Sequence, residues 1–182
     1  MRRLILLRHA KTERESLSGL DRDRRLDTRG RADAPVIGRY LAEHKLVPDL
    51  VLVSPATRTR ETWDLLAAAL NKVPAAEIVP DLYGAGASDL LQIIRMAVGR
   101  ADDRTLKSMM VVAHNPGLHE LSFALIGKAR AADREELEEN LPTSGLAVFK
   151  FAIDDWSDVS VRCGTLERFV TPKLLRFQSE GS

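Results

Sequence analysis

The chain has 182 residues, of which 45% are hydrophobic and 29% are charged, values typical of one soluble globular domain, so we expect a single domain over residues 1–182. The only cysteine, Cys163, excludes an internal disulfide framework and fits a reducing compartment, which predicts a cytoplasmic protein. The net charge is +1, and the aliphatic run before Arg8 is too short for a signal peptide or a membrane span. We therefore expect neither a nucleic acid nor a membrane as partner.

Short aliphatic runs alternate along the chain with longer segments of helical periodicity. The runs predict strands at Leu4–Leu7, Leu50–Val53, Ile78–Val79, Met109–Ala113, Leu146–Ala152 and Val159–Arg162. The periodic segments predict helices at Thr28–Lys45, Ala56–Leu70, Ser88–Val98 and Leu118–Ile126, and the chain after Pro172 is expected to be loosely ordered. This alternation predicts an α/β fold in which helices cover a central sheet.

The helix expected at Ala56–Leu70 has a recognisable start. Ser54 is suited to cap the helix and Pro55 to occupy its first turn. Pro35 fits less well inside the helix predicted at Thr28–Lys45, where it would introduce a kink or mark a later start.

Three polar motifs follow predicted strands. "RHAKT" follows the first strand, "SPATRTRET" follows the second and "AHNPG" follows the run at Met109–Ala113. Because sites in open α/β sheets form beyond the carboxyl ends of the strands, we expect these motifs to converge in space. Taken singly, each motif is also compatible with an ordinary structural role, such as a solvated helix residue or a turn.

The convergent residue types suit phosphoryl chemistry. Arg8 and Arg58 could each present a planar fork of donors to phosphate oxygens, and the N-terminus of the helix after Ser54 adds backbone N–H groups. A neutral histidine such as His9 can act as nucleophile, and a second histidine such as His114 can stabilise developing negative charge. Because the protein itself supplies the positive charge, the motifs predict no metal and no cofactor.

The segments "LLRHAKTE", "SPATRTRETW" and "VVAHNPGLHEL" resemble the histidine phosphatase (phosphoglycerate mutase-like) superfamily, and within it the small SixA-type phosphohistidine phosphatases. The similarity extends over roughly residues 3–152. Ala10 stands where the usual signature Arg-His-Gly has glycine, a change common in the SixA-like branch. The resemblance implies a three-layer α/β/α sandwich with a mostly parallel central sheet.

The resemblance also implies roles for individual residues. His9 would be the phosphorylated nucleophile, Arg8 and Arg58 would bind the phosphoryl oxygens, and His114 would complete the pocket. Additional contacts with the substrate would come from three neighbouring residues: Thr12, Lys11 and Asn115.

The expected general acid has no clear counterpart. Many relatives carry Glu or Asp after the third strand, where this chain reads "IVPDLYGAGASDLL". Asp81 is the nearest candidate, and Asp89, the next, also fits the first turn of a helix. General acid catalysis matters most for an alkoxide leaving group, whereas the imidazole that leaves a phosphohistidine is far less basic. A weak or absent acid therefore favours phosphohistidine as the substrate.

Three functions stay open at this level. The first is a metal-independent phosphatase acting on a phosphorylated protein, such as a histidine phosphotransfer domain. The second is a phosphatase for small phosphoesters, which a well-placed Asp81 would favour. The third is a non-catalytic module that binds phosphate or a phosphoprotein, although binding alone would not require His9.

Overall fold

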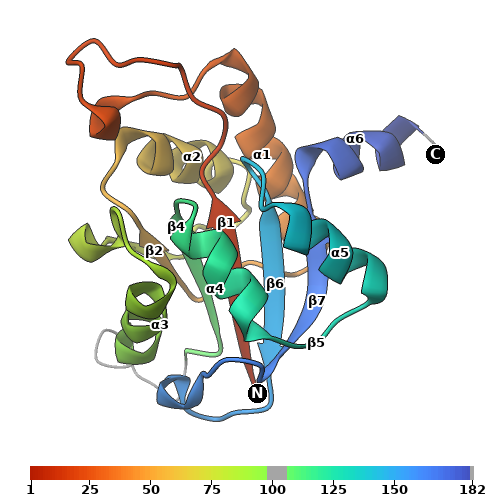
Figure 1. Cartoon of the computed structure of the whole chain (residues 1–182). Coiled ribbons are helices and arrows are strands. Elements are labelled where there is room, and N and C mark those ends of the chain that lie inside the picture. The colour runs from red at the N-terminus through yellow and green to blue at the C-terminus, as the bar shows by residue number, and fades with distance from the viewer. Residues whose placement is uncertain (98–105, 181–182) are drawn as a thin grey trace.

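A single mixed sheet of seven strands is the centre of the fold within residues 1–97 and 106–180, the part of the chain that the computed structural model describes (Figure 1). The strand order is β3-β2-β4-β1-β6-β7-β5. In chain order the strands are β1 Arg2–Arg8, β2 Leu50–Val53, β3 Ala75–Ile78, β4 Ser108–Ala113, β5 Ile126–Lys128, β6 Leu146–Phe151 and β7 Gly164–Val170.

The sheet is mostly parallel. Strands β3, β2, β4 and β1 run parallel to one another, and β5 runs parallel to β7. Strand β6 is antiparallel to both of its neighbours, β1 and β7. The carboxyl ends of β1, β2 and β4 therefore meet at one edge of the sheet.

Strand β1 shows why a continuous aliphatic run folds at the centre of such a sheet. Leu4 and Leu6 face one hydrophobic cluster, whereas Ile5 and Leu7 face the other. All four side chains are fully buried. Alternate side chains of a strand point to opposite faces, so a strand covered on both sides needs apolar residues at every position.

Helices cover both faces of the sheet. Helices α1, α2 and α6 pack on the Ile5 face, and α3, α4 and α5 pack on the Leu4 face, where Figure 1 shows α4 and α5 in front of the sheet. Their bounds are α1 Thr28–Glu43, α2 Thr57–Ala67, α3 Ala87–Arg95, α4 Gly117–Leu125, α5 Ala131–Glu139 and α6 Pro172–Glu180. The predicted α/β/α sandwich is confirmed.

Three sequence-based expectations for individual elements differ from the structure. The strand expected at Val159–Arg162 is wrong, because this segment follows the short 3-10 helix η4 (Trp156–Asp158), turns at Arg162 with φ +58°, and only then enters β7. The chain after Pro172 forms helix α6 instead of a loose tail. Helix α1 contains Pro35 in its interior and still begins at Thr28.

Smaller differences concern element ends. The third strand lies at Ala75–Ile78, so the expected run at Ile78–Val79 overlaps it by one residue. The end of the helix expected at Ser88–Val98 falls on Val98, outside the described residues. No helix among the described residues is both long and apolar enough to span a bilayer.

Replacing Leu6 in β1 tests the buried centre of the sheet. We expect Leu6→Ala to lower the free energy of unfolding by about 2–5 kcal/mol, because it removes methyl groups and leaves a cavity where relaxation is limited. Urea denaturation followed by circular dichroism measures the change. Leu17→Ala is the matched control, since Leu17 is fully exposed and its truncation should change stability by less than about 0.5 kcal/mol. Equal losses for both variants would contradict the packing described here.

Candidate active site

The pairing of β1 with β4 brings two histidines together. Arg8, the last residue of β1, pairs in register with Ala113, the last residue of β4. The next residue of each chain segment is a histidine, His9 after Arg8 and His114 after Ala113, and their ring centroids lie 5.3 Å apart. Both histidines are buried. The predicted convergence of the first and third motifs is thus a direct consequence of strand register.

The second motif reaches the same place through β2, which pairs with β4 on its other side. Ser54 follows β2, and its Oγ lies 2.7 Å from Nε2 of His114. The sequence predicts that Ser54 caps the helix, but in the structure its side chain binds His114 and the helix has no side-chain cap. Helix α2 begins at Thr57, and the hydroxyl of Thr59 donates to the carbonyls of Ser54 and Ala56.

Arg58 enters the site from the first turn of α2. Its side chain is 8% exposed, and its guanidinium donates from Nη1 to the carbonyl of Asp21 at 2.7 Å and from Nη2 to Oδ2 of Asp21 at 2.9 Å. The Arg58 carbonyl accepts from the hydroxyl of Thr62, which in turn accepts from the backbone N–H of Ala10. Helix α2 is thereby fixed against the segment that carries His9.

Burial and one hydrogen bond determine the state of the His9 ring. Its Nδ1 lies 2.8 Å from the carbonyl oxygen of Ala10. A carbonyl can only accept, so Nδ1 carries the proton and Nε2 of the neutral ring keeps its lone pair. Burial, helped by the neighbouring His114 ring and the charges of Arg58 and Arg8, lowers the pKa of His9 to about 3, although the Ala10 hydrogen bond acts in the opposite direction. At neutral pH His9 therefore has the form that a nucleophile needs.

His114 is also held neutral. Burial, followed by the charge of Arg58, lowers its pKa to about 4, although Asp21 acts in the opposite direction. Nε2 is bonded to Ser54, whereas Nδ1 is buried without a partner. If the Ser54 hydroxyl donates to Nε2, Nδ1 bears a hydrogen that is available to an incoming acceptor.

Arg8 and Asn115 are joined through one backbone carbonyl. Nη1 of Arg8 and Nδ2 of Asn115 both donate to Leu141, at 3.0 and 2.9 Å. Within the described residues, several buried polar atoms around this point have no hydrogen-bond partner: Arg8 Nε, His114 Nδ1, Asn115 Oδ1 and Ser144 Oγ. Because buried polar groups are nearly always bonded, such a cluster indicates a place for a polar ligand.

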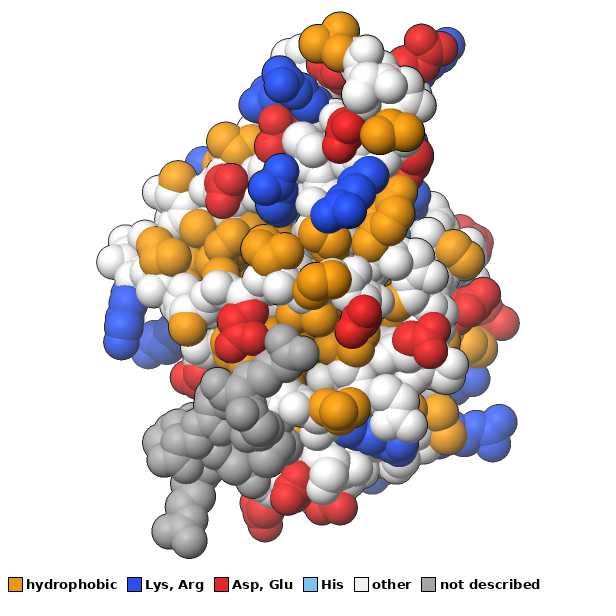
Figure 2. Space-filling model, turned by 90° about the vertical axis from the view of Figure 1, so that its left-hand side faces the viewer, with side chains coloured by type: hydrophobic (Ala, Val, Ile, Leu, Met, Phe, Trp, Pro, Cys, Tyr) orange, Lys and Arg blue, Asp and Glu red, His pale blue; other side chains and the backbone are white. Residues whose placement is uncertain are grey.

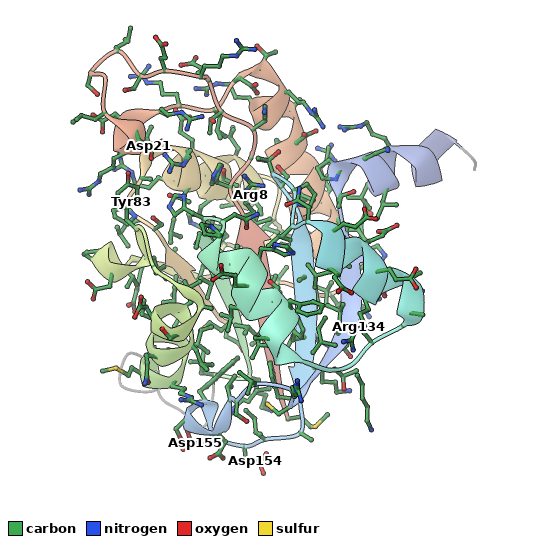
Figure 3. All side chains as sticks on the ribbon, viewed as in Figure 1. Arg8, Asp21, Tyr83, Arg134, Asp154 and Asp155 are labelled. Carbon is green, nitrogen blue, oxygen red and sulfur yellow. The ribbon has the colours of Figure 1, made fainter. Side chains whose placement is uncertain are left out.

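The loop between β1 and α1 contributes a carboxylate that sequence analysis missed. Asp21, in the 3-10 turn η1 (Asp21–Asp23), contacts Arg58 as described, and its Oδ1 accepts from Arg24 at 3.0 Å. The Tyr83 hydroxyl donates to Oδ2 of Asp21 at 3.0 Å (Figure 3). Burial alone would raise the pKa of Asp21, but the bonds from Arg24, Tyr83 and Arg58 lower it to about 2.

Tyr83 is the second residue that sequence analysis missed. Its ring meets the ring of His114 edge to face, with centroids 5.6 Å apart, and the guanidinium of Arg58 lies 5.9 Å from its centroid. Close packing holds this segment in place, because a Cβ on Gly117 would lie 2.1 Å from the carbonyl oxygen of Ala85. The glycine of the "AHNPG" motif thus lets the Tyr83 segment approach His114.

The remaining predicted residues lie at different distances from this cluster. Thr12 is buried, and its Oγ1 accepts from Nη2 of Arg24 at 2.6 Å, which joins it to the Asp21 network. Lys11 is exposed, and its backbone carbonyl accepts from Asp27. Asp81 is exposed in the 3-10 turn η2 (Pro80–Leu82), so Tyr83 is the residue of this segment that reaches His114.

The arrangement suits a doubly charged anion. The pKa of Arg8 is lowered mainly by burial and, next, by the positive charge of Arg58. The two guanidinium groups are therefore close enough to repel each other. The two neutral histidines can add an N–H donor and a lone pair without adding charge. No group of three or more His, Cys, Asp or Glu side chains placed to hold a metal ion occurs in residues 1–97 and 106–180.

Comparisons with known proteins agree with this geometry. The family model of the histidine phosphatase superfamily (branch 1) matches residues 4–86. An uncharacterized protein of Mycobacterium tuberculosis is 34% identical over 170 residues, which cover 92% of this chain and 100% of that protein.

Solved structures of similar fold include phosphatases. A protein of Agrobacterium tumefaciens that is classed as a phosphohistidine phosphatase of the SixA kind is 30% identical, with a TM-score of 0.77, covering 94% of this chain and 98% of that one. A mycobacterial glucosyl-3-phosphoglycerate phosphatase shares the fold at a TM-score of 0.56 and 18% identity, covering 82% and 93% of the two chains. The sequence matches, which span the strand-end motifs and nearly the whole chain, show that this protein belongs to the histidine phosphatase superfamily.

Proposed function

We propose that the protein is a metal-independent phosphatase that removes phosphate from protein-borne phosphohistidine through a covalent intermediate on His9. The observation that carries the proposal is the state of His9, a buried neutral ring whose Nδ1 is bonded to Ala10 and whose Nε2 lone pair is left for phosphorus. Arg8, Arg58 and His114 surround that ring with donors.

The proposed reaction has two displacements. First, Nε2 of His9 attacks phosphorus while the bond from phosphorus to the substrate imidazole breaks, and the leaving imidazole takes a proton from solvent. Arg8 and Arg58 bind the equatorial oxygens, and Nδ1 of His114 donates to them. Water then attacks the phosphoryl group on His9, which releases inorganic phosphate and the neutral ring.

The carboxylates near the site support phosphohistidine over an alcohol ester. Asp21, the carboxylate that contacts Arg58, has its pKa lowered to about 2 and is ionised at neutral pH, so it has no proton to give. Asp81 is exposed to solvent. An alkoxide leaving group benefits from a general acid by about 10²–10⁴-fold, and a leaving imidazole depends on one far less.

The surface of the loop that carries Asp21, together with Tyr83, supports a substrate carried by a protein. Leu17 and Leu20, in the loop that carries Asp21, are 102% and 62% exposed, and Tyr83 is 38% exposed. Figure 2 shows the face that contains η2 and α3, where hydrophobic side chains gather across the middle with arginine and lysine side chains above them. Gathered exposed apolar side chains are typical of surfaces that bind another protein. The likeness to the Agrobacterium protein supports the same substrate class.

Two other functions remain as alternatives. A small phosphoester could also reach His9, and the mycobacterial enzyme of the same fold is named as a phosphatase for such a compound. A module that only binds phosphate would need Arg8 and Arg58 but not the bonded, neutral His9.

Initial rates on two kinds of substrate test the proposed function. We expect faster turnover of a phosphohistidine-bearing phosphotransfer domain than of p-nitrophenyl phosphate or sugar phosphates, and no turnover of any of them by His9→Ala. His44→Ala is the matched control, because His44 is an exposed histidine at the end of α1 and should keep wild-type rates. A preference for esters would overturn the phosphohistidine substrate and make Asp81 the first residue to change. Turnover by His9→Ala would overturn the mechanism, and no turnover by the wild type would favour the binding module.

The ionisation of His9 provides a separate test. Its pKa lies at about 3, below the ordinary value of 6.5, so the neutral ring should persist as the pH falls from 8 to 5. We expect ¹⁵N NMR spectra to show Nδ1 protonated and Nε2 unprotonated, with no titration in this range. A short peptide with the same "RHA" segment should titrate near pH 6.5. Titration of His9 in the folded protein near pH 6.5 would contradict the buried, neutral nucleophile.

A further inference from the structure

We propose that Asp21 competes with phosphate for Arg58 and thereby keeps the affinity of the enzyme for its inorganic phosphate product low. This inference rests on the proposed function only in assigning Arg58 to the phosphoryl group. It adds a residue that sets how tightly the site holds an anion, and it concerns a carboxylate outside the three strand-end motifs.

The contact between Asp21 and Arg58 is unusually complete for a loop residue. Both terminal nitrogens of the guanidinium are engaged, one by the backbone carbonyl of Asp21 and the other by its carboxylate. Arg58 is almost fully buried, with 8% of its side chain exposed, whereas the side chain of Asp21 is 54% exposed. A buried cation is thus satisfied by a carboxylate that lies at the mouth of the site.

One guanidinium would have to serve two anions when phosphate binds. A guanidinium offers five N–H bonds, of which Asp21 uses two in the structure. Whichever edge the phosphate takes, the carboxylate then lies within a few ångströms of a dianion and repels it, with little solvent on the Arg58 side to screen the charges. Phosphate binding therefore requires Asp21 to move away or to remain at an electrostatic cost.

The structure gives Asp21 the means to move. The turn η1 contains no buried residue, so a shift of this turn does not disturb the hydrophobic clusters. Arg24 bonds Oδ1 of Asp21 and comes from the same loop, so the carboxylate keeps a cationic partner after it leaves Arg58. When phosphate departs, Asp21 can return and again satisfy the buried guanidinium, which favours release of the product.

The substitution Asp21→Asn removes the charge and keeps the size and one acceptor oxygen of the side chain. We expect isothermal titration calorimetry with inorganic phosphate to show binding about tenfold tighter than in the wild type. Inhibition of p-nitrophenyl phosphate hydrolysis by phosphate should strengthen by the same factor. Unchanged or weaker phosphate binding would overturn the inference and would make Asp21 a residue that merely positions Arg58.

Two further variants identify the origin of any change. Asp23→Asn removes the same charge from the same turn, but its carboxylate accepts from Ser18 and not from Arg58, so phosphate binding should stay within about twofold of the wild type. In the Arg58→Ala background, Asp21→Asn should give no further tightening, because the competition passes through Arg58. Equal tightening by Asp23→Asn, or full tightening without Arg58, would show a general charge effect and contradict the proposal.

The calorimetry does not depend on turnover, so the two proposals can fail separately. Tighter phosphate binding by Asp21→Asn in a protein that hydrolyses no phosphorylated substrate would sustain the competition and contradict the proposed function. Hydrolysis that depends on His9, together with phosphate binding that does not change in Asp21→Asn, would sustain the proposed function and contradict the competition for Arg58. Thermal unfolding of each variant confirms that the compared proteins are folded.

Discussion

The parallel pairing of β1 with β4 is the constraint on which the site depends. It places Arg8 beside Ala113, and therefore places His9 and His114 side by side at the carboxyl edge of the sheet. A shift of one residue in this register would turn the alternating side chains of β1 to the opposite faces. The apolar side chains of β1 and β4 are buried on both faces of the sheet, and the reactive histidines occupy the first positions beyond these strands.

Electrostatics explains how four basic side chains can share this edge. The two arginines keep their charge, whereas burial and the arginine charges keep both histidines neutral. The pocket thus combines two fixed cations with rings that can donate or accept a proton. In the structure Asp21 supplies the counter-charge to Arg58, and a phosphoryl group bound there would meet the same cation. Affinity for an anion therefore depends on a balance between the buried guanidinium and a carboxylate on a surface turn.

The central strands and the strand-end motifs could be predicted because their signals are local. Continuous aliphatic runs indicated β1, β2 and β4, and the polar residues directly after them indicated the site. Strand β7 was missed because Glu167 and Arg168 interrupt its apolar alternation at a point where the pairing with β6 is irregular. The neighbouring segment at Val159–Arg162 looked more like a strand, but it turns before the sheet begins.

The contacts of Asp21, Tyr83 and Ser54 could not be predicted, because they join segments far apart in the sequence. Asp21 and Arg58 are 37 residues apart, and Asp21 and Tyr83 are 62 apart. The position of the β1–α1 loop against α2 depends on these contacts themselves. The hydrophobic periodicity of the sequence does not predict contacts of this kind. Ser54 was expected to cap α2, a local interaction, but the proximity of β2 and β4 gives its hydroxyl a partner on the neighbouring strand end.

The most direct test of the account is to trap the covalent intermediate. The protein is mixed with ³²P-labelled phosphohistidine substrate, quenched in strong base within the first turnover, and digested for mass spectrometry. The account predicts a phosphoryl group on the peptide that contains His9, stable in base and lost in acid, as the N–P bond requires. Phosphate found on another residue, or steady turnover without any labelled protein, would contradict the central role of His9.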